Sequence, residues 1–234
     1  MSVSRKGLFA KRGRRAAFLG AVGLGACALL AACSPVQAGA AAIVGDQRIT
    51  VSNLDTQVSN LQEAAKPYGN SVQMTAAEMP SAVLSWMIRF QVMDQVAAAN
   101  GINVTDSQSQ AALTSLSSVA TQNGFTSTDE LLVANGVPPQ MFSQVGRWEA
   151  QQTALALKEN GGKAPTTTAE QNTVTAALTK AQCQASKTLD IKVSPQFGRL
   201  DYTPPFSVVA APDTLSRPAV SASPASTEGL APAC

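Results

Sequence analysis

Apolar residues recur every three or four positions along most of the chain between residues 50 and 190, which is the spacing of helices with one buried face. The pattern predicts five or six helices. The most apolar of them covers about residues 79 to 99 and carries two apolar stripes, Val83, Met87, Phe90 and Ala97 on one and Leu84, Ile88, Val92 and Val96 on the other. A helix that is apolar on more than one side is usually surrounded by its neighbours. We therefore expect this helix at the centre of the fold.

Polar residues mark the starts of several of these helices. A Ser or Thr followed three residues later by Glu or Gln can form a capping box, in which each side chain accepts a hydrogen bond from a free backbone amide. The pattern occurs at Thr75/Glu78, Thr105/Gln108, Ser127/Glu130 and Thr168/Gln171. Ser52 marks the first helix in a similar way, and Pro138-Pro139 favours the start of another.

Strand signals lie at the two ends of the helical region. Two β-prone runs, residues 41 to 44 and 47 to 50, flank the turn-forming pair Gly45-Asp46 and predict a hairpin. The stretch LDIKVSPQFGRLD, residues 189 to 201, alternates apolar and polar positions, then turns at a proline, and predicts a late strand. An isolated strand is not stable in water. We therefore expect the late strand to pair with the hairpin, through Ile191 and Val193 beside Ile43 and Val44.

The first 32 residues have the pattern of a secretory signal peptide, with basic residues ahead of an apolar run that contains no acidic residue. The run ends in LLAAC, which resembles a bacterial lipobox, so we expect cleavage before Cys33 and a diacylglycerol on its thiol. Residues 33 to 40 would then be a tether to the outer face of the cytoplasmic membrane. The alternative is an ordinary cysteine in an uncleaved transmembrane helix.

The other end of the chain has a different composition. Residues 202 to 234 are rich in Pro, Ser and Ala without helical or strand periodicity, and this predicts an extended, disordered tail. Cys183 and Cys234 would remain in a compartment where disulfides persist. The two cysteines could pair or stay as free thiols, and the sequence leaves both open.

Charge and composition exclude several functions. Six of the 17 Lys and Arg residues precede the apolar run, so removing residues 1 to 32 leaves 11 basic against 15 acidic residues, a net charge of −4, and gives no support for nucleic-acid binding. The chain has no histidine, which excludes Ser-His-Asp and Cys-His nucleophile systems and histidine metal sites. The adjacent Asp129 and Glu130 at a helix start suit the helix dipole. We expect a protein that is not an enzyme and has no cofactor.

Four segments, in order, carry a resemblance to a known family. They are AIVGDQRIT with the following SNLD, VLSWMIRFQVMDQVAAANGINVTD, GFTSTDELLVANGVPPQMFSQVGRWEAQQTAL, and IKVSPQFGRLD. Together they resemble the N-terminal chaperone module of the SurA/PrsA group of extracytoplasmic foldases, over about residues 41 to 201. The family usually closes with Asn-Pro-Arg-Phe/Tyr-Gly, and here Ser194 and Gln196 replace the Asn and the Arg.

The resemblance implies a mainly α fold closed by a small β-sheet, as in trigger-factor-like chaperone modules. Family members commonly carry a parvulin-type prolyl isomerase domain before the last helix, with histidines in its site. Here only residues 161 to 167 occupy that position, so we expect no isomerase activity of this kind.

The family implies binding of unfolded or exported polypeptides, and large apolar side chains are the candidates for lining a binding cleft. These candidates are Trp86, Met87, Phe90, Met141, Phe142 and Trp148. Any of them could instead be ordinary core. An alternative function is a non-enzymatic adaptor that docks one specific cell-envelope partner. A hydrolase would need a cleft of converging polar groups that the sequence does not indicate.

Overall fold

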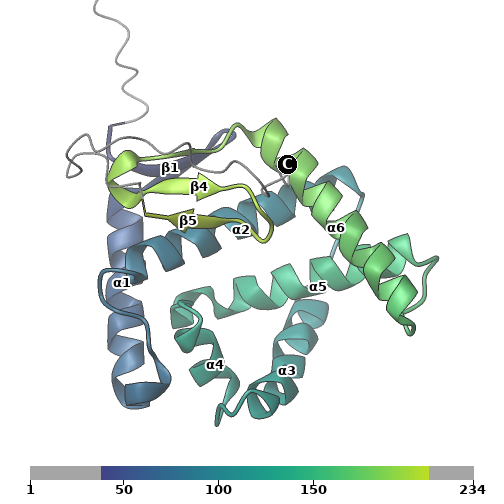
Figure 1. The fold of residues 1–234 in the computed structure, drawn as a ribbon, viewed down its shortest axis with the longest axis horizontal. Helices are drawn as coiled ribbons and strands as arrows, with labels where there is room; N and C mark the ends of the chain where they lie inside the picture. Colours follow the sequence, from purple (N-terminus) through teal and green to yellow (C-terminus); the bar gives the residue numbers. More distant parts are fainter. Residues whose placement is uncertain (1–37, 211–234) are drawn as a thin grey trace, which may run out of the picture. The chain divides into compact units, whose positions relative to one another are not determined.

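The computed structural model describes residues 38–210, and the predicted signal peptide, most of the tether and most of the tail lie outside them (Figure 1). The helices are α1 (Val51–Ala65), α2 (Met79–Ala99), α3 (Asp106–Gln122), α4 (Thr128–Ala134), α5 (Phe142–Glu159) and α6 (Thr168–Leu189). Short 3₁₀ turns are η1 (Lys66–Ser71), η2 (Pro139–Met141) and η3 (Pro195–Phe197). The strands are β1 (Ala40–Val44), β2 (Gln47–Thr50), β3 (Lys192–Val193), β4 (Arg199–Asp201) and β5 (Ser207–Val209). The predicted mainly α class is confirmed.

The main sheet joins the two ends of the helical region. Its order is β2-β1-β3 and both pairs are antiparallel, so the predicted pairing of the late strand with the N-terminal hairpin is confirmed. The predicted register was wrong: Val193 lies beside Ala42 and Lys192 beside Ile43. The reason is that α6 ends against the hairpin turn, where Gly45 N donates to Leu189 O at 2.5 Å. Ile191 therefore precedes the strand and is buried in the core.

A second, two-stranded sheet extends past the predicted end of the fold at Asp201, because β5 lies beyond that residue. β4 and β5 pair antiparallel, with Leu200 opposite Val208. Here the structure differs from the expectation of a disordered tail from residue 202, because Phe206 and Val208 are only 2% and 6% exposed. A strand of three residues is too short to show a periodicity, and what stabilises this one is contact with α2 (Figure 1).

Helix α2 is the centre of the described fold, as its two apolar stripes predict. It contacts α1, α5, α6, β1 and β5. Val83, Leu84 and Ile88 are fully buried, so both stripes face protein. None of the helices within residues 38–210 combines the length and the apolar character that a membrane crossing requires.

The predicted helix starts are partly right. Thr105 and Gln108 form the expected capping box, and the Ser127 side chain accepts from Glu130 N. The last helix instead uses Thr167 with Glu170, one residue before the predicted pair. Helix α1 begins earlier too, because the cap is Thr50 rather than Ser52.

The predicted cap at Thr75 does not start a helix directly. The Glu78 carboxylate accepts from Thr75 N and from Thr75 Oγ1, both at 2.8 Å, and α2 begins only after this turn. The Thr75/Glu78 pair thus stabilises a tight turn immediately before α2 and does not cap the helix itself. Residues 160 to 167 join α5 directly to α6.

Candidate functional site

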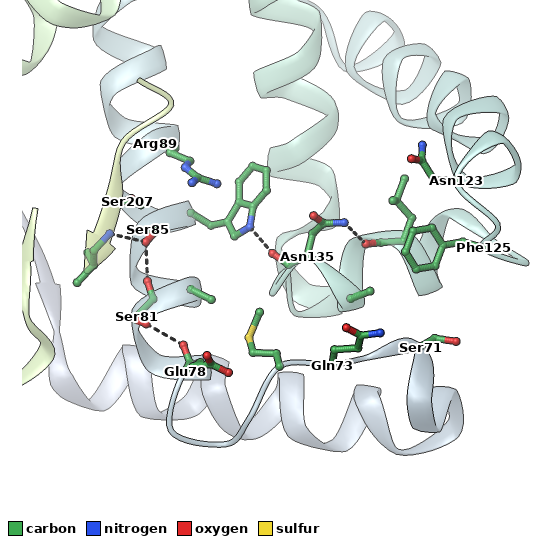
Figure 2. Close-up of a pocket in the computed structure, with 16 residues that line it drawn as sticks. Ser71, Gln73, Glu78, Ser81, Ser85, Arg89, Asn123, Phe125, Asn135 and Ser207 are labelled. Atoms are coloured by element: carbon green, nitrogen blue, oxygen red, sulfur yellow. Dashed lines mark hydrogen bonds between the residues drawn. The ribbon is translucent and has the colours of Figure 1, made fainter. Parts of the chain in front are cut away.

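An open groove of about 920 Å³ lies between α2, α4 and β5, and we call it the central groove (Figure 2). Figure 2 shows Ser207 and Ser85 on one side and Asn123 and Phe125 on the opposite side. The lining residues are Ser71, Gln73, Met74, Glu78, Ser81, Ala82, Ser85, Trp86, Arg89, Asn123, Phe125, Leu131, Ala134, Asn135, Ser207 and Val208. Most of them are apolar or carry uncharged amide or hydroxyl groups.

One face of α2 forms the longest wall of the central groove. Ser81, Ser85 and Arg89 are four residues apart, which places them in line on a single helix face. Ala82 and Trp86 follow the same spacing one residue further on and add apolar surface beside this polar line. The wall therefore presents a polar and an apolar strip next to each other.

Trp86 is held in position on this wall by contacts on several sides. Its Nε1 donates to Asn135 O at 2.8 Å, which ties α2 to the end of α4. The Trp148 ring packs against it edge to face with centroids 5.5 Å apart, and the Phe90 ring lies at 5.6 Å. The Arg89 guanidinium carbon lies 4.8 Å from the centroid of the Trp86 ring, within the range of a cation–π contact. A half-buried indole fixed in this way loses little conformational freedom when a ligand packs on it.

Two side chains of α2 also hold the C-terminal segment that forms one edge of the groove. Arg89 Nε donates to the carbonyl oxygens of Pro205 and Phe206, each at 2.7 Å. Ser85 Oγ accepts from Val208 N at 2.8 Å and donates to Ser81 O at 2.6 Å. Residues 205 to 208 are therefore fixed along α2.

The groove carries one negative and one positive side chain, at different points along α2. Hydrogen bonds from the backbone and side chain of Thr75 lower the pKa of Glu78, so this carboxylate is charged at neutral pH. Burial lowers the pKa of Arg89, but a guanidinium keeps its proton in proteins. The opposite charges leave the lining without a strong net field.

The titratable side chains of the described residues do not gather into a metal-binding cluster. Residues 38–210 contain no group of three or more His, Cys, Asp or Glu side chains suited to a metal ion. The groove has serine hydroxyls, but its one carboxylate is hydrogen-bonded to Thr75.

The six apolar candidates from the sequence do not share one surface. Of these described residues, only Trp86 lines the central groove. Phe90 and Met141 are buried at 7% and 3% exposure, and Met87 and Phe142 pack partly buried against the core. Trp148 contacts the Trp86 ring and, with Phe90, lines a separate cavity of about 70 Å³.

The cysteine predictions fall mostly outside the described residues. Cys33 and Cys234 both lie there. Cys183 is buried at 7% exposure in α6 and is disulfide-bonded. Its pairing with Cys234 stays a prediction.

Sequence reasoning missed the polar part of the groove. Ser81, Ser85 and Arg89 interrupt the apolar pattern of α2 at a spacing of four residues, and that is the signal that could have found them. Asn135 and Ser207 had no such signal, because they reach the groove only through tertiary packing.

The fold and the groove belong to a helical module whose family can be identified by comparison with known proteins. A family model described as a SurA-like N-terminal domain matches residues 16–155, which extends from before β1 into α5. The chain belongs to the SurA-like N-terminal domain family. No curated protein and no solved structure matches the chain.

Proposed function

We propose that this protein is a lipid-anchored, extracytoplasmic chaperone-like lipoprotein that binds segments of unfolded or exported polypeptide in the central groove. It has no prolyl isomerase activity and is held on the outer face of the cytoplasmic membrane by the lipid on Cys33. The observation that carries the proposal is the open groove with Trp86 fixed in its wall, in a chain of the SurA-like N-terminal domain family.

The lining of the groove suits an extended peptide of variable sequence. Amide and hydroxyl groups such as those of Gln73, Asn123 and Ser207 can pair with backbone N–H and C=O groups, which every peptide has. Met74 and Trp86 offer one adaptable and one rigid apolar surface. Since the two charged groups have opposite signs, the groove does not select strongly for charge. These features support binding of many sequences rather than one.

The arrangement of the groove supports binding without catalysis. A serine nucleophile needs a nearby base. The hydrogen bonds that keep Glu78 ionised also lower its basicity, and a guanidinium cannot act as a base. The lining residues thus offer hydrogen bonds and apolar contact but no proton acceptor suited to activating a hydroxyl.

An aggregation assay with the mature chain tests the proposal. The chain should suppress light scattering by several unrelated unfolding proteins, for example reduced insulin and heat-denatured citrate synthase. Met74→Glu should weaken the suppression, because it places a second carboxylate near Glu78 in the groove. The matched control is Val119→Glu on α3, an apolar side chain that is 42% exposed and is not among the groove-lining residues. It should leave suppression unchanged.

The same assay separates the proposal from its alternative. No suppression with any unfolding protein would contradict the chaperone function. If the chain then also captured one dominant envelope protein through the groove, lost in Met74→Glu and kept in Val119→Glu, the protein would be an adaptor instead.

A further inference from the structure

The described chain ends beside the central groove and heads along it. Arg89 holds the carbonyls of Pro205 and Phe206, and Ser85, one helical turn nearer the start of α2, accepts from Val208 N. β5 therefore runs antiparallel to α2, from Arg89 towards Glu78. Figure 2 shows Ser207, Ser85, Ser81 and Glu78 following one another in this direction. The described chain therefore ends, at Ala210, just past a strand that runs along the α2 wall of the groove.

We propose that the segment after Ala210 binds back into the central groove of its own chain, with Leu215 on the apolar strip and Arg217 at Glu78. In this arrangement residues 211 to 234 are an internal occupant that competes with external polypeptide. The competition rests on the proposed function, whereas the docking itself does not.

The distances permit this docking. Ser85 and Glu78 are seven residues apart, which at about 1.5 Å per residue of helix is roughly 10 Å along α2. The nine residues from Val208 to Arg217 can span up to about 30 Å when extended. The segment can therefore reach Glu78 with enough spare length to cross the width of the groove.

The chemistry of the segment complements the groove. Only one oxygen of Glu78, Oε2, accepts from Thr75, and Oε1 has no hydrogen-bond partner among the described residues. An arginine at this point would pair with the one carboxylate of the lining. The sequence around it, APDTLSRPAV at residues 211 to 220, offers Leu215 between small residues and two prolines. Prolines restrict the free segment, so less entropy is lost when it docks.

Tethering makes even a weak contact effective. A short flexible connection keeps a segment at a local concentration in the millimolar range near its site. If the segment occupies the groove for nine-tenths of the time, the apparent affinity for an external polypeptide falls about tenfold.

Amide and indole NMR signals test the docking directly. The mature chain is compared with the same chain ending at Ala210, and the Trp86 indole signal is assigned with a Trp148→Phe variant. We expect the Trp86 and Asn135 signals to differ between the two chains at every protein concentration. Identical signals would overturn the proposal. A difference that disappears on dilution would overturn it too, because the occupant would then be a second copy.

Charge reversal tests the predicted contact. Arg217→Glu in the full mature chain should reproduce the Trp86 shift caused by truncation, and adding Glu78→Lys should restore the signal of the unaltered chain. Glu228→Lys, in the same segment, should have no effect, and neither should Cys234→Ser. If Glu228→Lys or Cys234→Ser caused the same shift as Arg217→Glu, the contact at Glu78 would be refuted.

A binding experiment separates the docking from the proposed function. The probe is reduced, carboxymethylated α-lactalbumin, a permanently unfolded protein. Truncation after Ala210 should raise its affinity roughly tenfold. If neither chain binds the probe while the Trp86 shift is present, the chaperone function fails and the docking stands. If both bind it equally and no shift occurs, the docking fails and the function stands.

Discussion

Ser85 links the central helix to the C-terminal segment through a single hydroxyl. The side chain is 4% exposed, and its oxygen accepts from Val208 N at 2.8 Å. Ser85→Ala would leave this buried amide without a partner, so we expect a loss of about 1–3 kcal/mol in the free energy of unfolding. Urea denaturation followed by circular dichroism measures the loss.

A serine with a purely local hydrogen bond is the matched control for Ser85. Ser115 Oγ donates to Ala112 O on the exposed part of α3. Ser115→Ala should change the free energy of unfolding by less than about 0.5 kcal/mol. Equal effects of the two substitutions would show that the contact between Ser85 and β5 adds no stability.

Glu130 gives the fold a defined sensitivity to acid. Its carboxylate accepts from Thr126 Oγ1 at 2.5 Å and from Thr126 N at 2.7 Å. Hydrogen bonds from the Thr126 side chain, the Ser71 side chain and the Thr126 backbone lower the pKa of Glu130 in the folded state. When the pH falls, the unfolded chain takes up this proton first, near the usual glutamate pKa of about 4.3. The stabilisation is therefore present above this pH and is lost as the pH falls towards the folded-state pKa.

The acid profile of a Glu130→Gln variant tests this effect. We expect the difference in unfolding free energy between the unaltered chain and the variant to be constant from pH 7 to about 5.5 and to shrink below about pH 4.3. Urea unfolding at several pH values measures it. A Glu130 difference that does not change with pH would contradict the assignment.

At the residue scale, the sequence indicated only part of the site. Trp86 could be named as a candidate for the lining of a cleft, because a large aromatic residue in a helix either binds a ligand or packs in the core. The role of Arg89 could not be foreseen, since its partners are carbonyls 116 and 117 positions away. Phe90 and Met141 were indistinguishable from Trp86 by type, and only packing places them in the core.

At the scale of whole elements, α3 and α5 approach each other closely where Gly146 lies. A Cβ at this position would overlap Ser109 O and would lie 3.0 Å from Leu113 Cβ. Gly146→Ala would favour the isolated helix, but it overpacks the contact because a helix backbone cannot move aside alone. We expect a net loss of about 1–3 kcal/mol in the free energy of unfolding, measured by urea denaturation.

An exposed position in the same helix controls for helix propensity. Ser143→Ala in α5 adds no atom to the contact with α3 and should be neutral or slightly stabilising. If Gly146→Ala instead raised the free energy of unfolding, α3 and α5 would have room to separate and the overpacking argument would be contradicted.

The helices were predictable because each is long enough to show a period and most begin with a recognisable cap. α2 was placed at its observed bounds, and the Thr105 capping box formed as expected. The division of the predicted late strand into β3 and β4, and the presence of β5, were not predictable, since strands of two or three residues carry no period. The position of β5 is decided by Phe206 and Val208 packing against the rest of the fold, which no local pattern reports.

At the scale of the whole molecule, the proposed anchor makes a testable demand. In cells, the unaltered protein should sediment with membranes and incorporate labelled fatty acid. Cys33→Ser should remove the label and release the protein from the membrane fraction, because the acyl chains supply the membrane affinity. Cys183→Ser is a control that should keep the label. A Cys33→Ser protein that still carries fatty acid would contradict the anchor.

The strand order of the main sheet has a consequence for synthesis. β1 can join β2 at once, but its other neighbour, β3, follows all six helices of the described chain. Throughout most of translation one side of β1 therefore lacks its ladder partner, and an open strand edge is a template for pairing with foreign strands. Since pairings between distant parts of a chain also form slowly, a protein proposed to protect other polypeptides would need protection itself until β3 has been made.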